Sequence, residues 1–529
     1  MAQVINSLYF QLPLLLLLQA TLHHAYFKVC RLPVDAYFSP NIFTHIPSNS
    51  PLFVFFVAHS VITILLYKRI SWNTIDEKNA ARNFVFIICF VIGWYFTTYD
   101  FNFYYNQAHL TDRFILVLLT LLVFIHPLFV PPFIMFVLLI AYQLQYPLPE
   151  AAWLWPDKKL LIDGIFVFHA FLYLHILLKS NVSLLLFSTL CLTGGIYFYA
   201  AIFKLSIGPN WYSWMVDNKL SNLVISSYLS GWLGFLNQES AIRITHIVET
   251  FERPLQFYTI ITEISGLLIL ASIRSSRIIL MGFVLMHLGI LASSGIFFWK
   301  WVIFDLALCF FVTAQSQNEN VQIYNRKYFA LSIVTIVGAL FYFRPVYFAW
   351  FDSKMSNFFE IYAVTEDGNK YRIEPRFFSP WDIIFTQSRF YYLTDNKILV
   401  GTYGSSFNYE LTKKLESAHN EDIDHLKEIY GKSFYSSHSQ MRFIQFVTEY
   451  MKNAEVRREK FIWLNSLSPP YHFRIFENEN HFDFQAKIKF IELRQVEYLY
   501  TGKEIINVGN ETIMKFPLSS SPTQGKTGL

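Results

Sequence analysis

Glu263 and His287 are the two residues whose type and position most clearly suggest chemistry. Each lies near the middle of a long apolar run, Leu255–Ile273 for the glutamate and Ile278–Phe297 for the histidine. The four residues from Arg274 to Arg277 form a short link, so two antiparallel helices would bring both side chains to a similar depth. An ionisable side chain among apolar helices is costly unless it faces a partner or a polar cavity. We therefore expect a buried polar site here. The alternative is a hydrogen-bonded pair that fixes helix packing, a contact worth about 0.6 kcal/mol between membrane helices.

Lys204 is a third candidate, at the end of the apolar run Ser183–Phe203. A glycine-proline turn follows it, and then an aromatic stretch that begins with Trp211. One interpretation is a lysine that extends its amine from the membrane surface into water. The other is a partly buried amine that acts as a base near neutral pH. The residue types alone leave both interpretations open.

Three further side chains lie in or beside apolar runs. His169 is close to the middle of its run and would either join the polar site or serve a structural role. Asp305 lies near the end of another run, and we expect it to pair with Lys300. His126 precedes a proline, so we expect it to cap or kink a helix.

The elements that must position these residues are membrane helices. Of the 529 residues, 54% are hydrophobic and 15% are charged, against about 25% charged in soluble proteins. The apolar excess lies before Phe343, and a full membrane crossing needs roughly 20 apolar residues. We predict a polytopic α-helical membrane bundle of about 9–11 helices with a C-terminal soluble α+β domain. The candidate runs are Leu8–Leu22, Leu52–Tyr67, Asn83–Tyr99, Phe114–Val130, Phe133–Gln145, Leu160–Leu178, Ser183–Phe203, Leu255–Ile273, Ile278–Phe297, Trp301–Ala314 and Tyr328–Phe343.

Basic residues at the ends of these runs predict which side faces the cytoplasm, because lysine and arginine are enriched in cytoplasmic loops. Alternation of the runs then places the segment after Lys204 and the C-terminal domain outside the cytoplasm, with the bacterial inner membrane as the expected location. It also requires Phe114–Gln145 to cross twice, and we expect a hinge at Pro131 and Pro132. The basic residues assigned to the inner side are Lys68, Arg69, Lys78, Arg82, Lys179, Arg274, Arg277, Arg326 and Lys327.

We predict three parts along the chain. Residues 1–345 form the bundle, within which 204–253 is a long loop of aromatic and polar residues lying in the membrane interface. Residues 352–517 form the outer α+β domain, and 518–529 form a disordered tail. In the α+β domain we expect a hairpin of Phe358–Val364 and Lys370–Ile373, helices at Ile423–Tyr430 and Gln440–Lys452, and a strand at Lys487–Tyr500 followed by a turn at Gly502.

Several function classes find no support in the sequence. The four cysteines include no CxxC pair, and there is neither an HExxH motif nor a glycine-rich phosphate loop, so we predict no metal site. The net charge of +4 is scattered, and no basic run interleaved with aromatics suggests nucleic acid.

Two short motifs resemble a known family. Tyr197–Trp214, which reads YFYAAIFKLSIGPNWYSW, and Met286–Ile290, which continues to Gly295–Phe298, resemble the vitamin K-dependent gamma-carboxylase-like transmembrane domain, also called the HTTM domain. Glu263 stands where many bacterial members of that family carry an acidic residue.

The resemblance implies a membrane-embedded lyase that modifies an extracytoplasmic peptide or protein. It assigns Lys204 as the base that deprotonates a reduced, vitamin K-like quinone, with Glu263 and His287 in the buried polar site. We assign Trp211 and His169 to the quinone-binding region, next to membrane lipid. The alternative is a non-catalytic scaffold or accessory subunit, whose C-terminal domain docks a partner in a larger membrane assembly.

Overall fold

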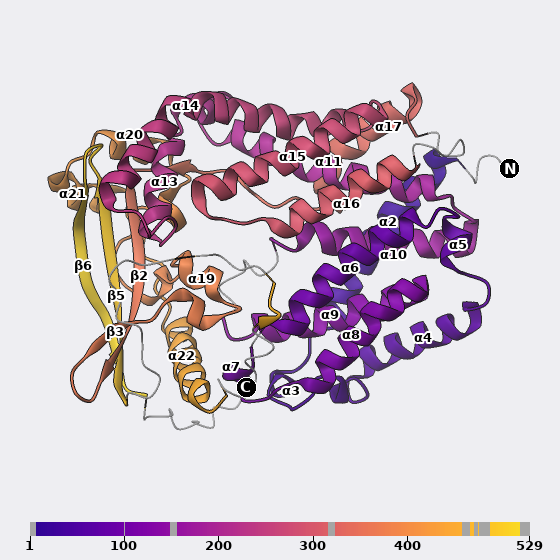
Figure 1. The fold of residues 1–529 in the computed structure, drawn as a ribbon, viewed down its shortest axis with the longest axis horizontal. Helices are drawn as coiled ribbons and strands as arrows, with labels where there is room; N and C mark the ends of the chain where they lie inside the picture. The colour runs from indigo at the N-terminus through magenta and orange to yellow at the C-terminus, as the bar shows by residue number, and fades with distance from the viewer. Residues whose placement is uncertain are drawn as a thin grey trace.

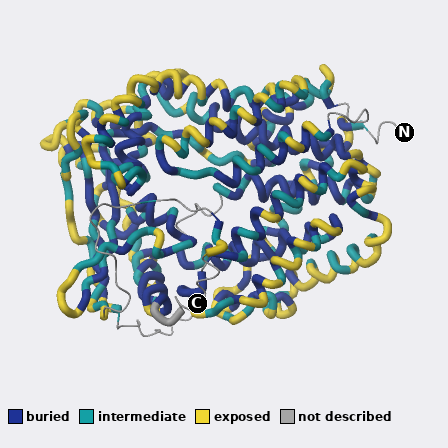
Figure 2. Tube along the Cα trace, viewed as in Figure 1, coloured by how far each residue is buried: buried dark blue, intermediate teal, exposed yellow. Residues whose placement is uncertain are grey.

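The computed structural model describes residues 7–99, 101–148, 156–315, 323–457, 466–469, 474 and 487–518. Helices fill most of the molecule, and a twisted antiparallel sheet closes one end (Figure 1). Buried residues line the spaces between helices, whereas exposed residues follow the outer rim (Figure 2). The longer helices of this bundle are α2 (Leu8–Val29), α4 (Ser50–Leu66), α6 (Ala80–Thr98), α8 (Leu110–Ile125), α9 (Val130–Gln145), α10 (Lys159–Leu178), α11 (Val182–Ser206), α14 (Gln238–Ile264), α15 (Ile273–Ser294), α16 (Trp299–Gln315) and α17 (Arg326–Val337).

Five helical segments in the described part of the chain are long and apolar enough to cross a membrane. The other apolar runs form shorter or more polar helices, such as α4 with 17 residues. The segments of spanning length are Ala80–Thr98, Pro127–Gln145, Lys159–Leu178, Val182–Ser206 and Ile273–Ser294.

The run Leu255–Ile273 is not a single helix, which corrects the prediction from the sequence. Helix α14 ends at Ile264 and passes into a 3₁₀ turn, Ser265–Leu268. In this turn Gly266 lies directly against Gly194 of α11, where an added Cβ would come within 2.6 Å of the facing carbonyl oxygen. Helix α15 then begins at Ile273. The two predicted loop arginines therefore belong to the first turns of α15.

The predicted interfacial loop 204–253 is also largely helical. It contains α12 (Ser213–Asp217) and α13 (Leu220–Leu229), and its last part is the first half of α14. This half carries charged residues but continues without a break into the apolar half, since proline at position 254 does not interrupt the helix.

The hinge before α9 lies five residues earlier than predicted. Helix α8 ends at Ile125, and the ring of His126 accepts a hydrogen bond from the Leu128 amide at 3.3 Å. The other ring nitrogen of His126 binds the carbonyl oxygens of two residues near the end of α4. Pro131 and Pro132 lie in the first turn of α9, a position where proline removes no helical hydrogen bond. The capping role predicted for His126 is confirmed.

The C-terminal domain contains a four-stranded antiparallel sheet in the order β3-β2-β5-β6. The predicted hairpin and the strand before Gly502 are confirmed, and Gly502 has the positive φ of +91° that this turn needs. The pairing of β5 with β6 shifts register twice. The strands are β2 (Met355–Thr365), β3 (Lys370–Arg372), β5 (Ile488–Tyr500) and β6 (Ile505–Phe516), and the predicted helices are α21 (Ile423–Tyr430) and α22 (Ser437–Arg457).

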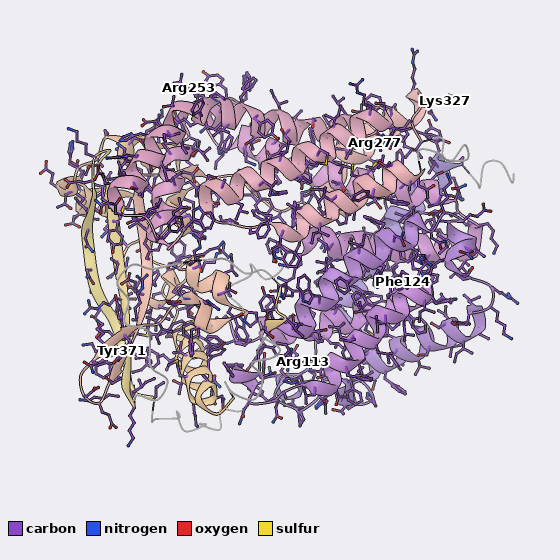
Figure 3. All side chains as sticks on the ribbon, in the orientation of Figure 1. Arg113, Phe124, Arg253, Arg277, Lys327 and Tyr371 are labelled. Carbon is purple, nitrogen blue, oxygen red and sulfur yellow. The ribbon has the colours of Figure 1, made fainter. Side chains whose placement is uncertain are left out.

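Buried contacts join the sheet domain to the bundle. The indole of Trp381 donates to the carbonyl oxygen of Leu144 in α9 at 2.8 Å, and it is fully buried. Arg277 and Lys327 lie at the end of the bundle remote from the sheet, whereas Tyr371 marks the sheet (Figure 3). The tail predicted at 518–529 falls outside the described residues after position 518.

Candidate functional site

Lys204 and Glu263 form an ion pair near the ends of two facing helices. The Lys204 amine donates to both carboxylate oxygens of Glu263, at 2.6 and 2.9 Å. Lys204 lies in the last turn of α11 and Glu263 in the last turn of α14. Because helical side chains lean toward the helix N-terminus, both extend back into the bundle and meet. Their side chains are only 11% and 5% exposed, so the pair is largely withdrawn from water.

Tyr197 lies on the same face of α11, seven residues before Lys204. Its hydroxyl donates to Asp305 Oδ2 of α16 at 2.7 Å and also bonds His287 Nε2 of α15 at 2.7 Å. The ring stacks on Phe283, with centroids 3.6 Å apart. Three helices, α11, α15 and α16, thus meet at one tyrosine.

Tyr197, His287 and Asp305 form a triad of hydrogen-bonded side chains. A tyrosine hydroxyl carries one proton, and here that proton goes to Asp305. With Asp305 ionised, this arrangement has His287 donating from Nε2 to the tyrosine oxygen and Nδ1 as an acceptor. Within the described part of the chain, His287 Nδ1 and Asp305 Oδ1 are both buried without a hydrogen-bond partner. Buried polar atoms are nearly always satisfied, so this pair of atoms suggests a place for a polar molecule.

The ion pair and the triad belong to one electrostatic unit. The charge of Lys204 acts on the imidazole of His287, and the charge of Glu263 acts on Tyr197. Together they provide an amine, two carboxyls, an imidazole and a phenol within the helical bundle. Such a set can hold and move protons.

Glu263 and His287 therefore belong to one site, and side chains of α11 connect them. Among the described residues no hydrogen bond joins the two directly, since Lys204 holds one and Tyr197 the other. The sequence missed Tyr197, although its spacing of seven residues from Lys204 was available as a signal.

The expected pairing of Asp305 with Lys300 is wrong. Lys300 donates instead to Asp157 at 2.6 Å, while Asp305 accepts from Tyr197. A spacing of five residues puts two side chains on different sides of a helix, because neighbouring positions on one face are three or four residues apart.

Trp211 and His169, which we assign to a quinone from the sequence, do not contact the ion pair or the triad. Trp211 is 68% exposed and contacts the ring of Tyr212. The aromatic residue over Lys204 is Trp214, whose ring centroid lies 5.5 Å from the amine nitrogen. His169 is buried in a separate aromatic cluster, beside Tyr26.

The described ranges contain no cluster of three or more histidine, cysteine or acidic side chains that could bind a metal ion. The cysteines Cys30, Cys89 and Cys191 are free thiols inside the bundle.

Comparison of the chain with protein-family models, curated proteins and solved structures gave no match. The site is therefore interpreted from its own geometry.

Proposed function

We propose that this chain is a multi-pass membrane protein, with the shorter helices completing a bundle of nine to eleven. Large apolar side chains cover the outer surface of the bundle, where a soluble protein would expose far fewer. Arg277 and Lys327 lie at the end of the bundle remote from the sheet (Figure 3). We assign this basic end to the cytoplasm, so that the sheet domain lies outside the cytoplasm of a bacterial inner membrane. The exposed side chains that support this include Val54 and Ile64 of α4, Phe114 and Ile125 of α8, Ile247 and Phe257 of α14, and Ile278 and Leu285 of α15.

We further propose that Lys204 is the base of a membrane-embedded enzyme that modifies an extracytoplasmic peptide or protein. The observation that carries this is the buried Lys204–Glu263 pair beside the Tyr197 triad. The step starts from the ion pair, in which both partners are charged. Transfer of one proton along the 2.6 Å contact from Nζ to Oε1 gives a neutral amine and a neutral acid. The neutral amine then accepts the proton of a substrate hydroxyl.

A reduced quinone fits this donor set, and it would supply a lipid-soluble hydroxyl for deprotonation. His287 Nδ1 is a buried ring nitrogen with no hydrogen-bond partner among the residues that the structure describes, and Phe298 and Trp301 pack around its ring. Lys204 and His287 would bind its polar groups. The resemblance to the carboxylase-like family points to the same class of reaction, a lyase.

Quinol-dependent oxygen uptake by the protein in phosphatidylcholine nanodiscs tests the proposal. Lys204→Met should lower the rate at least a hundredfold, within the range of general base catalysis. Lys327→Met changes a lysine at the remote end of the bundle and should leave the rate unaltered. Equal rates for wild type and Lys204→Met would remove Lys204 from the mechanism.

A non-catalytic scaffold is the second candidate, because the C-terminal domain exposes apolar side chains at the end of α21, at the start of α22 and in the link between them. Aromatic and apolar residues of this kind are enriched at protein interfaces. Co-purification of a defined membrane partner, lost on Phe434→Ser, would support this role. The residues are Ile429, Phe434, Tyr435 and Met441.

A further inference from the structure

A short helix covers Lys204. After α11 the chain makes a turn at 207–212 and enters α12, whose Trp214 lies over the Lys204 amine. Ser213, Trp214 and Met215 of α12 are buried, whereas Val216 of the same helix is exposed, as is Trp211 before it. Helix α12 therefore has one face toward Lys204 and the other toward solvent.

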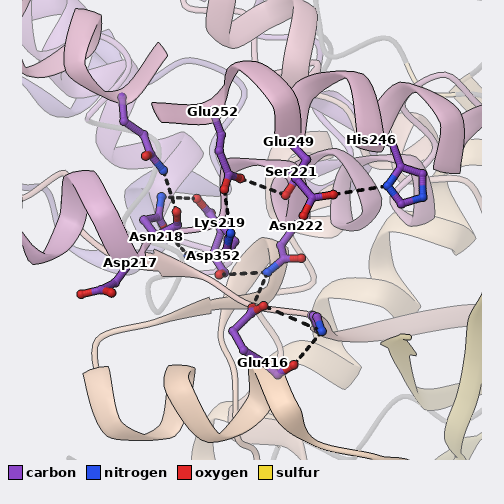
Figure 4. Close-up of polar contacts among 12 residues, drawn as sticks. Asp217, Asn218, Lys219, Ser221, Asn222, His246, Glu249, Glu252, Asp352 and Glu416 are labelled. Atoms are coloured by element: carbon purple, nitrogen blue, oxygen red, sulfur yellow. Dashed lines mark hydrogen bonds and ion pairs between the residues drawn. The ribbon is translucent and has the colours of Figure 1, made fainter. Parts of the chain in front are cut away.

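The C-terminal end of α12 is held by the sheet domain. Asn218 follows α12 directly and makes two bonds with Asp352, the last residue of β1 (Phe351–Asp352). The Asp352 amide donates to Asn218 Oδ1 at 2.7 Å, and Asn218 Nδ2 donates to Asp352 Oδ2 at 3.0 Å (Figure 4). Gln256 of α14 donates to the Asn218 carbonyl oxygen at 2.7 Å. We call the pair Asn218–Asp352 the latch.

The other end of α12 is attached by a turn with glycine and proline. Gly208 lies so close to Ser213 that an added Cβ would come within 2.2 Å of its side chain. The Asn210 amide donates to the Ser213 hydroxyl at 3.1 Å. The helix is thus attached at 207–212 on one side and held against the C-terminal domain on the other. The latch is one of these contacts; the Trp214 indole also donates to the Trp350 carbonyl oxygen at 2.9 Å, and Asp217 accepts from Tyr409 and Lys413.

The latch contains a carboxyl group in an unfavourable place for a negative charge. Asp352 is 3% exposed. Burial raises its pKa to about 7, the charge of Glu252 adds to this rise, and hydrogen bonds from Asn218 and Trp350 oppose it. The cations around the latch are engaged by other groups: Lys219 by Glu252, Lys354 by Glu416 and Lys413 by Asp217.

We propose that α12 is a lid over Lys204 and that loss of the Asp352 proton opens it. An ionised Asp352 is buried beside Glu252 when the lid is closed but reaches water when the latch separates. Control of catalysis by this lid rests on the proposed function, whereas the movement itself does not.

The pH dependence follows from proton linkage. With an ordinary pKa of 3.8 in the open state and about 7 in the closed state, opening releases one proton between these values. The open population therefore rises about tenfold per pH unit up to about pH 7 and is constant above it.

Thiol labelling measures this population. In a Cys309→Ser background, we compare the labelling rate of the buried position in Met215→Cys with that of the exposed position in Trp211→Cys. The ratio of the two rates cancels the pH dependence of the reaction between a thiol and the reagent. It should rise about tenfold per pH unit from pH 5 to pH 7 and then level off.

Two variants decide the cause. Asp352→Asn has no carboxyl to ionise, so the ratio should not change with pH. Glu252→Gln removes the neighbouring negative charge, so the plateau should begin at a lower pH, and this variant keeps the test open if Asp352→Asn does not fold. A ratio independent of pH in the wild type, or an unchanged rise in either variant, overturns the proposal. The labelling needs no turnover, so its result stands apart from the Lys204→Met experiment.

Discussion

The Lys204–Glu263 pair should show a large coupling energy in a double-mutant cycle. At a separation of 2.6 Å and an effective dielectric constant of about 20, the Coulomb attraction is about 6 kcal/mol. Desolvation of both groups offsets much of this gain. Lys204→Met alone, or Glu263→Met alone, leaves one buried charge without its partner and should lower the free energy of unfolding by about 3–5 kcal/mol.

The double variant removes both charges together. It should lose less than about 2 kcal/mol, because an apolar pair of similar volume replaces a buried ion pair with little cost. The coupling energy should then exceed about 3 kcal/mol, measured by denaturant unfolding in mixed micelles.

The matched control is the pair Arg243–Glu239, which lies on the charged half of α14 with both side chains 73% exposed. Its coupling should be below about 1 kcal/mol, since water screens exposed ion pairs. If the coupling of Lys204 with Glu263 is no larger than that of the control, the pair is not buried and charged, and the reasoning about the site fails.

Two further perturbations test the packing of the bundle and the charges of the sheet. Gly194→Ala puts a methyl group against a backbone oxygen and should lower the free energy of unfolding by about 1–3 kcal/mol. In Gly289→Ala the added methyl group meets no atom within 4 Å, so this variant should raise the free energy of unfolding by up to about 1 kcal/mol. Equal melting temperatures for the two variants would contradict the close helix contact. Burial tends to raise the pKa of Glu492, but hydrogen bonds from Lys370 and Arg494 outweigh it and lower the pKa to about 2. Its stabilisation is present above about pH 4.5 and lost as pH falls toward 2, by about 1–3 kcal/mol; unfolding free energies of Glu492→Gln should lack this dependence.

The helices that the sequence predicts best are those with an uninterrupted apolar run. The run around His169 became α10, and the run before Lys204 became α11, with ends close to those expected. Helix α14 was missed as a unit because its first half carries charges and shows no apolar run. Its end at Ile264 depends on the contact between Gly194 and Gly266, which is distant in sequence.

The partners within the site depend on how each helix is rotated about its axis. Apolar composition does not set that rotation, because several faces of α11 are equally apolar. The sequence therefore indicated that Glu263 and His287 are buried and polar, yet it could not assign Lys204 and Tyr197 as their partners. The contact of Asp305 with Tyr197 depends on α16 lying beside α11, and the apolar runs do not predict which helices are neighbours.

The shifts of register along β6 have a consequence for neighbouring molecules. An edge strand with a regular row of free amides and carbonyls is a template for a strand of another chain. The two irregularities at Leu493/Arg494 and Glu497/Tyr498 interrupt that row, because a bulge bends and twists the strand. At the opposite edge, β3 has only three residues. Neighbouring copies of the chain are thus kept from pairing their sheets edge to edge into aggregates.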